Sequence, residues 1–250
     1  MILTESVVKR HGALVAVDDV SVRIRPGVTA IIGPNGAGKS TLLAAIGRLT
    51  GTDGGRISID SLDVATTKTR DLARRLAILR QDNHLAIRLS VSDLVAYGRF
   101  PHGGSGRSRD DREHVDRAIE LLDLDAVRDR FLDELSGGQR QRAFVAMALA
   151  QDTDHLLLDE PLNNLDPRHG VSLMKLVRRL ADERRMTVVV VLHDINVAAQ
   201  YADDIVAMRD GRVVHHGPVS EVVTSERLAA LYDTPARVAA IDGRPIVLWE

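Results

Sequence analysis

The chain has 250 residues, a formal net charge of −2 and no cysteine. This length suits one large domain or a core with an inserted subdomain, and a hydrophobic content of 44% is typical of a protein with a buried core. The lack of cysteine excludes disulfides, thiol catalysis and thiolate metal sites, and the near-neutral charge gives no indication of nucleic acid as a partner.

The apolar segments do not predict a chain that enters a membrane by itself. Residues 1–5 lack the basic start and apolar core of a signal peptide. The longest apolar runs, such as residues 188–192, are far too short to cross a bilayer. We therefore expect a soluble chain whose role at a membrane depends on a partner.

The first third of the chain predicts short strands around a Gly-rich loop. Alternating or continuous apolar residues predict strands at 6–8, 15–24, 28–32 and 56–59. The loop that follows residue 32 leads into a helix predicted at 40–49. Residues 72–79 have helical spacing that leads into a strand ending near Gln81.

The character of the sequence changes to helical between residues 86 and 150. Helices are predicted at 90–98, 110–122 and 136–150, with a Gly-rich loop at 100–107. This pattern indicates one domain, residues 1–250, in which a helical subdomain (86–150) interrupts an α/β core (1–85 and 151–250).

The core is predicted to resume after residue 150. Strands are expected at 155–158 and 187–192, with a helix around 169–184 between them. Residues 203–208 and 212–215 are predicted to be edge strands, joined by Asp210-Gly211 as a two-residue hairpin turn. A single helix is expected at 219–231.

The loop after residue 32 has the spacing G-x-x-x-x-G-K-S/T. Its residues, with the following threonine, are Gly33, Pro34, Asn35, Gly36, Ala37, Gly38, Lys39, Ser40 and Thr41. Glycines let backbone N–H groups surround phosphates, and the helix N-terminus favours an anion. Lys39 is expected to reach the β- and γ-phosphates and Ser40 to hold Mg²⁺. A plain Gly-rich turn is the alternative, but the preceding strand and the following helix favour a phosphate-binding loop.

Two further segments carry groups suited to phosphate chemistry. Asp159 and Glu160 follow the apolar strand at 155–158, at the strand end where open α/β sheets bind ligands. Ser136-Gly137-Gly138-Gln139 opens a helix with a good N-cap and exposed N–H groups, which predicts a second anion site. Alone, Asp159 and Glu160 could be ordinary solvated carboxylates, and residues 136–139 could be an ordinary capped helix start. Because both accompany a phosphate-binding loop, a role at the nucleotide is favoured for each segment.

These motifs, in this order, resemble the ATP-binding subunits of ABC transporters over essentially the whole chain. The resemblance implies an α/β fold: a P-loop NTPase (RecA-like) core with an antiparallel β subdomain and an inserted α-helical subdomain. It implies ATP and Mg²⁺ as cofactors, Glu160, His193 and Lys39 as catalytic residues, and Ser40, Gln81 and Asp159 as metal ligands.

The resemblance also implies the remaining nucleotide contacts. Gln81 is similar to the Q-loop glutamine, His193 to the switch histidine that contacts the γ-phosphate, and Asp166 to the D-loop aspartate. His11 stands where the family usually has an aromatic residue that stacks on adenine. The motif at 136–139 is implied to meet ATP bound to a second copy of the chain.

Three shorter segments resemble the iron–siderophore importer subgroup: Asn163-Asn164, residues 150–154 and residues 97–101. They imply import of an iron compound, a ferric siderophore, by a peripheral subunit on the cytoplasmic face of the cell membrane. Its partners would be a second copy, transmembrane permease subunits in contact with residues 81–101, and indirectly a substrate-binding protein.

Other functions remain open at this stage. An importer of haem or cobalamin is one, and a soluble non-transport ABC ATPase acting on DNA or ribosomes is another. Only 97 positions separate Lys39 from Ser136, and no sustained heptad pattern lies between them, which disfavours the long coiled-coil arms of DNA-repair members. An exporter would usually be fused to its membrane domain, and a simple P-loop kinase would not need residues 136–139.

Overall fold

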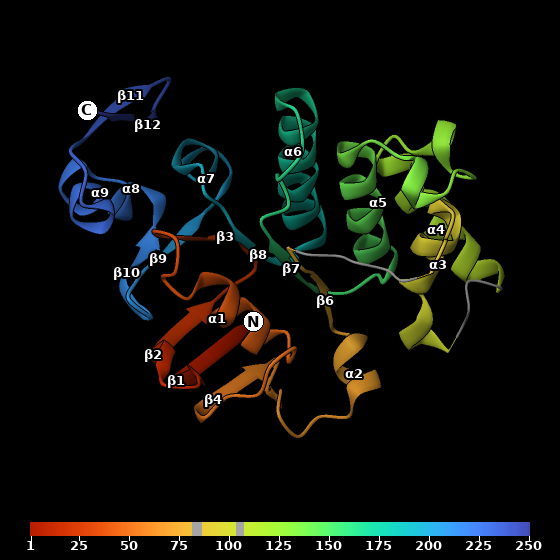
Figure 1. The fold of residues 1–250 in the computed structure, drawn as a ribbon, viewed down its shortest axis with the longest axis horizontal. Coiled ribbons are helices and arrows are strands. Elements are labelled where there is room, and N and C mark those ends of the chain that lie inside the picture. Colours follow the sequence, from red (N-terminus) through yellow and green to blue (C-terminus); the bar gives the residue numbers. More distant parts are fainter. Residues whose placement is uncertain (82–86, 104–107) are drawn as a thin grey trace. The chain divides into compact units, whose positions relative to one another are not determined.

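Two units make up the chain, which is an α/β protein with parallel and antiparallel sheets. The computed structural model describes residues 1–81, 87–103 and 108–250 (Figure 1). Unit 1 consists of Met1–Thr67 and Leu180–Glu250, and unit 2 consists of Lys68–Arg179. The narrower helical subdomain at 86–150 stays a prediction. No helix within the described residues is both long and apolar enough to span a bilayer.

Unit 1 contains an antiparallel sheet with the strand order β2-β1-β4-β5. Its strands are β1 (Ile2–His11), β2 (Leu14–Ile24), β4 (Gly54–Ile59) and β5 (Leu62–Asp63). The strand predicted at 6–8 is therefore much longer. Its apolar alternation is broken by an irregularity between Thr4 and Val7, where Ser6 has a φ of 47°.

A second group of strands in unit 1 lies in the order β10-β9-β3-β8, in which β9, β3 and β8 are parallel and β10 is antiparallel to β9. They are β3 (Gly27–Ile32), β8 (Thr187–Val191), β9 (Asp204–Arg209) and β10 (Arg212–Pro218). The side chains of β3 and β8 are almost completely buried, which explains their continuous apolar runs. The prediction that β9 is an edge strand is wrong, because β9 pairs with β3 as well as β10. Asp210 and Gly211 have φ values of 51° and 79°, which confirms the predicted turn.

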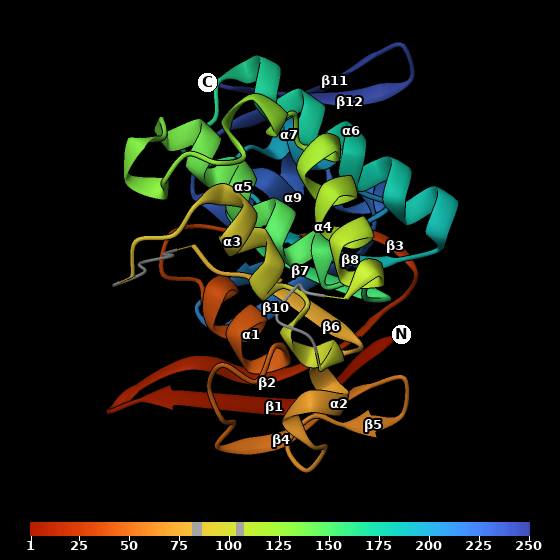
Figure 2. The ribbon, with the colours of Figure 1, turned by 90° about the vertical axis from the view of Figure 1, so that its right-hand side faces the viewer.

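The helices of unit 1 are α1 (Lys39–Ile46), α7 (Ile195–Tyr201), α8 (Val219–Val222) and α9 (Ser225–Tyr232). Helix α1 packs on β1, β2 and β8, and Figure 2 shows it beside the antiparallel sheet. The single helix predicted at 219–231 is wrong. The chain leaves the helical region at Val223, and Thr224 caps α9 by accepting a hydrogen bond from the Arg227 N–H.

The sequence analysis missed α7 and a C-terminal hairpin. The hairpin pairs β11 (Ala236–Ile241) with β12 (Arg244–Trp249) through Asp242-Gly243, both at positive φ. This turn has the same chemistry as Asp210-Gly211, so the Asp-Gly pair was an available indication.

Unit 2 combines a pair of parallel strands with a group of helices. The strands are β6 (Leu76–Leu79) and β7 (His155–Asp159). The helices are α2 (Thr69–Ala73), α3 (Val91–Tyr97), α4 (Arg109–Leu121), α5 (Gly137–Ala150) and α6 (Pro167–Arg184), the last of which continues into unit 1. Helices α3, α4 and α5 pack against one another (Figure 1). Of the Gly-rich loop predicted at 100–107, Phe100–His102 form a short 3₁₀ turn and 104–107 lie outside the described residues.

The segment at 97–101 has a structural role within unit 2. The Arg99 guanidinium is 3% exposed and forms an ion pair of 2.9 Å with Asp111, which is 5% exposed. Arg99 also donates to the carbonyl oxygen of Ala150 at 3.0 Å. Hydrogen bonds from Ser108 and Arg99 lower the pKa of Asp111 below its ordinary value. Arg99 thus ties the end of α3 to α4 and α5.

Replacing Asp111 with Asn is expected to lower the free energy of unfolding at neutral pH by about 3 kcal/mol, because Arg99 loses its buried counter-charge. The native pKa of Asp111 is depressed, so its contribution is complete above the unfolded pKa of about 3.9 and is lost as the pH falls through the native value. Urea denaturation of both proteins from pH 7 to pH 3 measures this. An equal difference at both ends of the range would contradict the ion-pair explanation.

Candidate phosphate-binding and hydrolytic site

The phosphate-binding loop joins β3 to α1 and has the shape that its glycines permit. Gly33 and Gly38 have φ values of 144° and 94°. A Cβ atom would lie 2.0 Å from the Met208 carbonyl oxygen at Gly33 and 2.1 Å from the Ala16 carbonyl oxygen at Gly38. Only glycine meets both the steric and the backbone requirement at these two positions.

Lys39 lies inside this loop. Its side chain is buried, and its ammonium donates to the carbonyl oxygens of Gly33 at 2.8 Å and Pro34 at 2.9 Å. Lys39 and Ser40 begin α1, and Thr41 follows them. A cation held by the loop, next to a helix N-terminus, is suited to binding phosphate.

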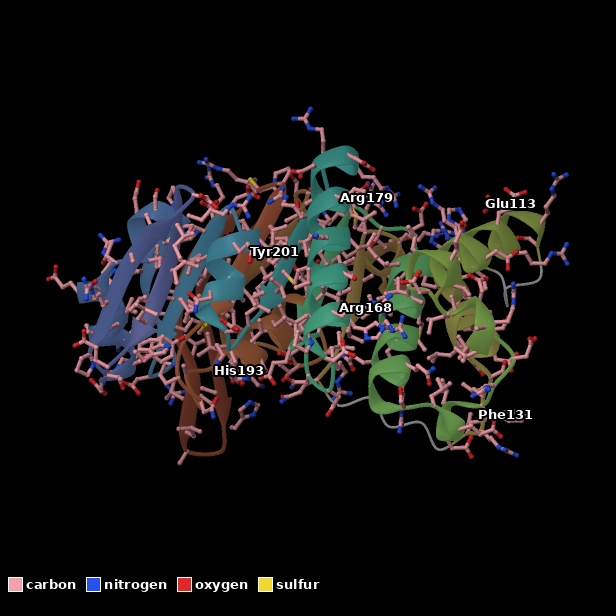
Figure 3. The ribbon with its side chains drawn as sticks, turned by 90° about the horizontal axis from the view of Figure 1, so that it is seen from above. Glu113, Phe131, Arg168, Arg179, His193 and Tyr201 are labelled. Atoms are coloured by element: carbon pink, nitrogen blue, oxygen red, sulfur yellow. The ribbon has the colours of Figure 1, made fainter. Side chains whose placement is uncertain are left out.

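His193 and His11 belong to the same unit as the loop. His193 is exposed and directly precedes Asp194, which caps α7, while Tyr201 lies at the far end of that helix (Figure 3). The N–H of Leu192 donates to the Ile31 carbonyl oxygen at 3.2 Å, so His193 leaves β8 at the edge where β3 enters the loop. His11 ends β1 and is exposed beside Leu14, at the tip of the β1–β2 hairpin.

One residue near the loop was missed by the sequence analysis. The Tyr232 hydroxyl, at the end of α9, is buried and has no hydrogen-bond partner among the described residues. Burial raises the pKa of Tyr232 to about 12, and the backbone N–H of Gly33, which lies near the hydroxyl without forming a hydrogen bond of good geometry, opposes this rise. Its ring meets Trp249 edge-on, with centroids 5.3 Å apart. No local pattern could reveal this, because 199 positions separate Tyr232 from Gly33.

In unit 2, Asp159 and Glu160 stand at the end of β7 and are each 8% exposed. The Gln81 amide donates to Glu160 Oε2 at 2.7 Å, and the Asn163 amide donates to the same oxygen at 2.7 Å. The structure therefore brings Gln81 and Glu160 together, although 79 positions separate them. Sequence analysis had not assigned Asn163 to this cluster.

Ser136 caps α5, as predicted. Its hydroxyl accepts from the Gln139 N–H at 3.3 Å, and the Gln139 side chain accepts from the Ser136 N–H at 3.1 Å. This is a capping box, which the S-x-x-Q spacing could have indicated. Ser136 and Gly137 are exposed, so the start of α5 is accessible to a ligand.

Asp166 lies just before α6 and binds the start of that helix. Its carboxylate accepts from the backbone N–H of His169 and lies 2.9 Å from the His169 Nδ1 atom. These hydrogen bonds lower the pKa of Asp166. Asp166 thus caps the N-terminus of α6.

The proposed metal ligands are suited to Mg²⁺. Ser40, Gln81 and Asp159 offer oxygen donors, the class of ligand that Mg²⁺ prefers. Among the described residues, no cluster of three His, Cys, Asp or Glu side chains offers a ready-made metal site. By unit, Lys39, Ser40, His11 and His193 belong to unit 1, whereas Gln81, Ser136, Asp159, Glu160 and Asp166 belong to unit 2.

Comparison with known proteins identifies close relatives. Residues 17–163 match the ABC transporter family. The chain is 44% identical over 250 residues to the petrobactin import ATP-binding protein YclP of Bacillus subtilis (strain 168), covering 100% of this chain and 99% of YclP. It is 46% identical over 250 residues to the petrobactin import ATP-binding protein FatE of Bacillus anthracis, covering 100% of both.

A solved structure shows the same fold. The dimeric bacterial ABC transporter cassette MJ0796 superimposes with a TM-score of 0.81 at 29% identity, covering 88% of this chain and 99% of that one. This agreement confirms the expected P-loop NTPase fold.

Proposed function

Because this chain belongs to the ABC transporter family of ATP-binding subunits, we propose that it powers the uptake of a ferric siderophore across the cell membrane. As a member of this family it binds and hydrolyses ATP. The observation that carries the choice of cargo is its similarity, over the full length of the chain, to two petrobactin import subunits.

The proposed roles in hydrolysis follow from the chemistry of each group. The phosphate-binding loop holds the ATP phosphates through its backbone N–H groups, and Lys39 neutralises charge on the β- and γ-phosphates. Glu160 orients the attacking water and takes its proton. His193 contacts the γ-phosphate, and His11 lies against adenine.

Mg²⁺ is proposed to be held by Ser40, Asp159 and Gln81. When bound, it supplies charge neutralisation at the phosphates. Ser40 lies in the first turn of α1, and Asp159 ends β7. The Gln81 amide nitrogen donates to Glu160, and its oxygen is the atom proposed to bind the metal.

The assembly proposed is a pair of copies bound to membrane permease subunits at the cytoplasmic face, with a substrate-binding protein as an indirect partner. A second copy is supported by the dimeric form of MJ0796. For the permease, the proposed contact lies within residues 81–101, where Tyr97 is 54% exposed and Phe100 is 74% exposed. Large exposed aromatic side chains suit a protein partner.

Uptake of labelled ferric siderophore in a deletion strain tests the cargo. Expression of this chain should restore uptake, whereas the Lys39→Ala variant should not. Restored uptake of haem or cobalamin, without the siderophore, would contradict the proposal.

Co-purification from detergent-solubilised membranes tests the partner. The chain should bring permease subunits with it. Recovery on ribosomes or DNA, with no membrane protein attached, would instead identify a soluble ABC ATPase.

A further inference from the structure

In the turn that follows β7, the side chain of Asn163 contacts the carboxylate of Glu160. The Asn163 amide donates to Glu160 Oε2 at 2.7 Å, and the Asn163 backbone N–H donates to the Glu160 carbonyl oxygen at 3.2 Å. The N–H of Leu165 donates to the Leu162 carbonyl oxygen at 3.1 Å. Asn163 therefore belongs to a short hydrogen-bonded turn that begins at Glu160, the residue whose carboxylate the Asn163 side chain holds.

Glu160 itself has an unusual backbone for its residue type. Its φ is 49°, in the left-handed region that glutamate rarely adopts. Its side chain is 8% exposed, so few alternative positions are open to the carboxylate. A backbone in this region persists only where the surroundings support it.

Helix α5 supports the turn at two further points. The Gln141 side chain, 9% exposed, donates to the Pro161 carbonyl oxygen at 3.2 Å. A Cβ atom at Gly138 would lie 3.3 Å from the Asn164 carbonyl oxygen, so the turn passes close to the first turn of α5. Asn164 has a φ of 63°, a conformation that asparagine tolerates better than most residues.

The side-chain amides of Gln81 and Asn163, which both donate to Glu160, lie in different parts of unit 2. Gln81 lies two positions beyond the end of β6, and its hydrogen bond joins segments 79 positions apart. Asn163 lies three positions from Glu160, in a turn that α5 supports. Gln81 also has a proposed task at the metal, whereas Asn163 has none. The Asn163 amide is therefore the donor to Glu160 whose position is fixed locally, by the turn and by α5.

We propose that Asn163 is a positioning residue for the hydrolytic reaction: it holds the Glu160 carboxylate in the orientation that the attacking water requires. This inference rests on the proposed role of Glu160 as the general base. A hydrogen bond to a charged group restricts both its position and its direction. Precise placement of a base affects the chemical step more than the binding of substrate.

The test compares Asn163→Ala and Asn163→Asp with the unaltered chain. Asn163→Ala removes the donor, and we expect kcat to fall about tenfold, the size expected for losing one hydrogen bond to a charged group. The KM for ATP and the affinity for a non-hydrolysable ATP analogue should stay unchanged. Asn163→Asp keeps the shape but places a second carboxylate against Glu160, so its kcat should fall further.

A matched control is Gln151→Ala. The Gln151 amide donates to the carbonyl oxygens of Ala73 and Leu76 in the same unit. This variant should unfold at a lower temperature and keep its kcat at saturating ATP. If Asn163→Ala acted only through stability, it would behave like this control, and the proposal would be overturned.

A double-mutant cycle with Glu160→Gln separates this inference from the proposed function. With the base already removed, Asn163→Ala should have no further effect on the residual rate, because two residues that act as a unit are not additive. A full additional loss would overturn the positioning role and leave Glu160 as the base. Normal turnover by Glu160→Gln alone would overturn both.

Discussion

Glu160→Gln is expected to lower kcat for ATP hydrolysis by about a hundredfold to ten-thousandfold, the usual range for the loss of a general base. Glutamine has nearly the same shape but cannot take a proton from water. The affinity for ATP should survive, because Lys39 and the loop N–H groups, which we propose to bind the phosphates, are unaltered. Steady-state hydrolysis and equilibrium binding of a labelled ATP analogue measure the two quantities.

A suitable control is Glu113→Gln, the same change on the exposed surface of α4, where Glu113 pairs with Arg109 (Figure 3). We expect its kcat to equal that of the unaltered chain. Normal turnover by Glu160→Gln, in the same assay, would remove Glu160 from the catalytic role.

Ser136→Arg is expected to abolish ATP-driven pairing of two copies and, with it, turnover. The exposed start of α5 is proposed to meet ATP bound to the other copy, and a long cationic side chain would fill that contact. ATP binding to the separate chain should remain, because Ser136 lies outside the phosphate-binding loop. Sedimentation or light scattering with ATP and the Glu160→Gln background measures pairing without hydrolysis.

The loss of a helix cap complicates this variant, since removing an N-cap costs about 0.5–2 kcal/mol of stability. Ser90→Arg is a matched control, because Ser90 caps α3 through the same kind of capping box. The Ser90→Arg variant should lose a similar amount of stability, and two copies of it should still pair when ATP is added. Cooperative hydrolysis by Ser136→Arg would contradict a site shared between copies.

The local elements were largely predictable because their causes are local. The phosphate-binding loop, the Ser136 cap and the Asp210-Gly211 turn each depend on a few neighbouring residues whose backbone preferences are strong. The failures have equally physical reasons. β9 was predicted at an edge although residues 205–208 form a continuous apolar run, which is typical of a strand with neighbours on both sides. The helix at 219–231 was overextended because the break at Val223 involves neither Gly nor Pro.

The candidate site shows the same division. Sequence and motif order alone selected the residues that we propose to carry the chemistry: Lys39, Asp159, Glu160 and the segment at 136–139. They also determined the fold, which the relatives and MJ0796 confirm.

Only the tertiary structure decided which side chains contact one another. Gln81 and Asn163 meet on one oxygen of Glu160, Arg99 is buried against Asp111, and the Tyr232 hydroxyl is buried in the unit that holds the phosphate-binding loop. Such contacts join side chains through space, between segments whose separation along the chain no periodicity records. A motif specifies a residue's chemical group, whereas the packing around it specifies its direction and its neighbours.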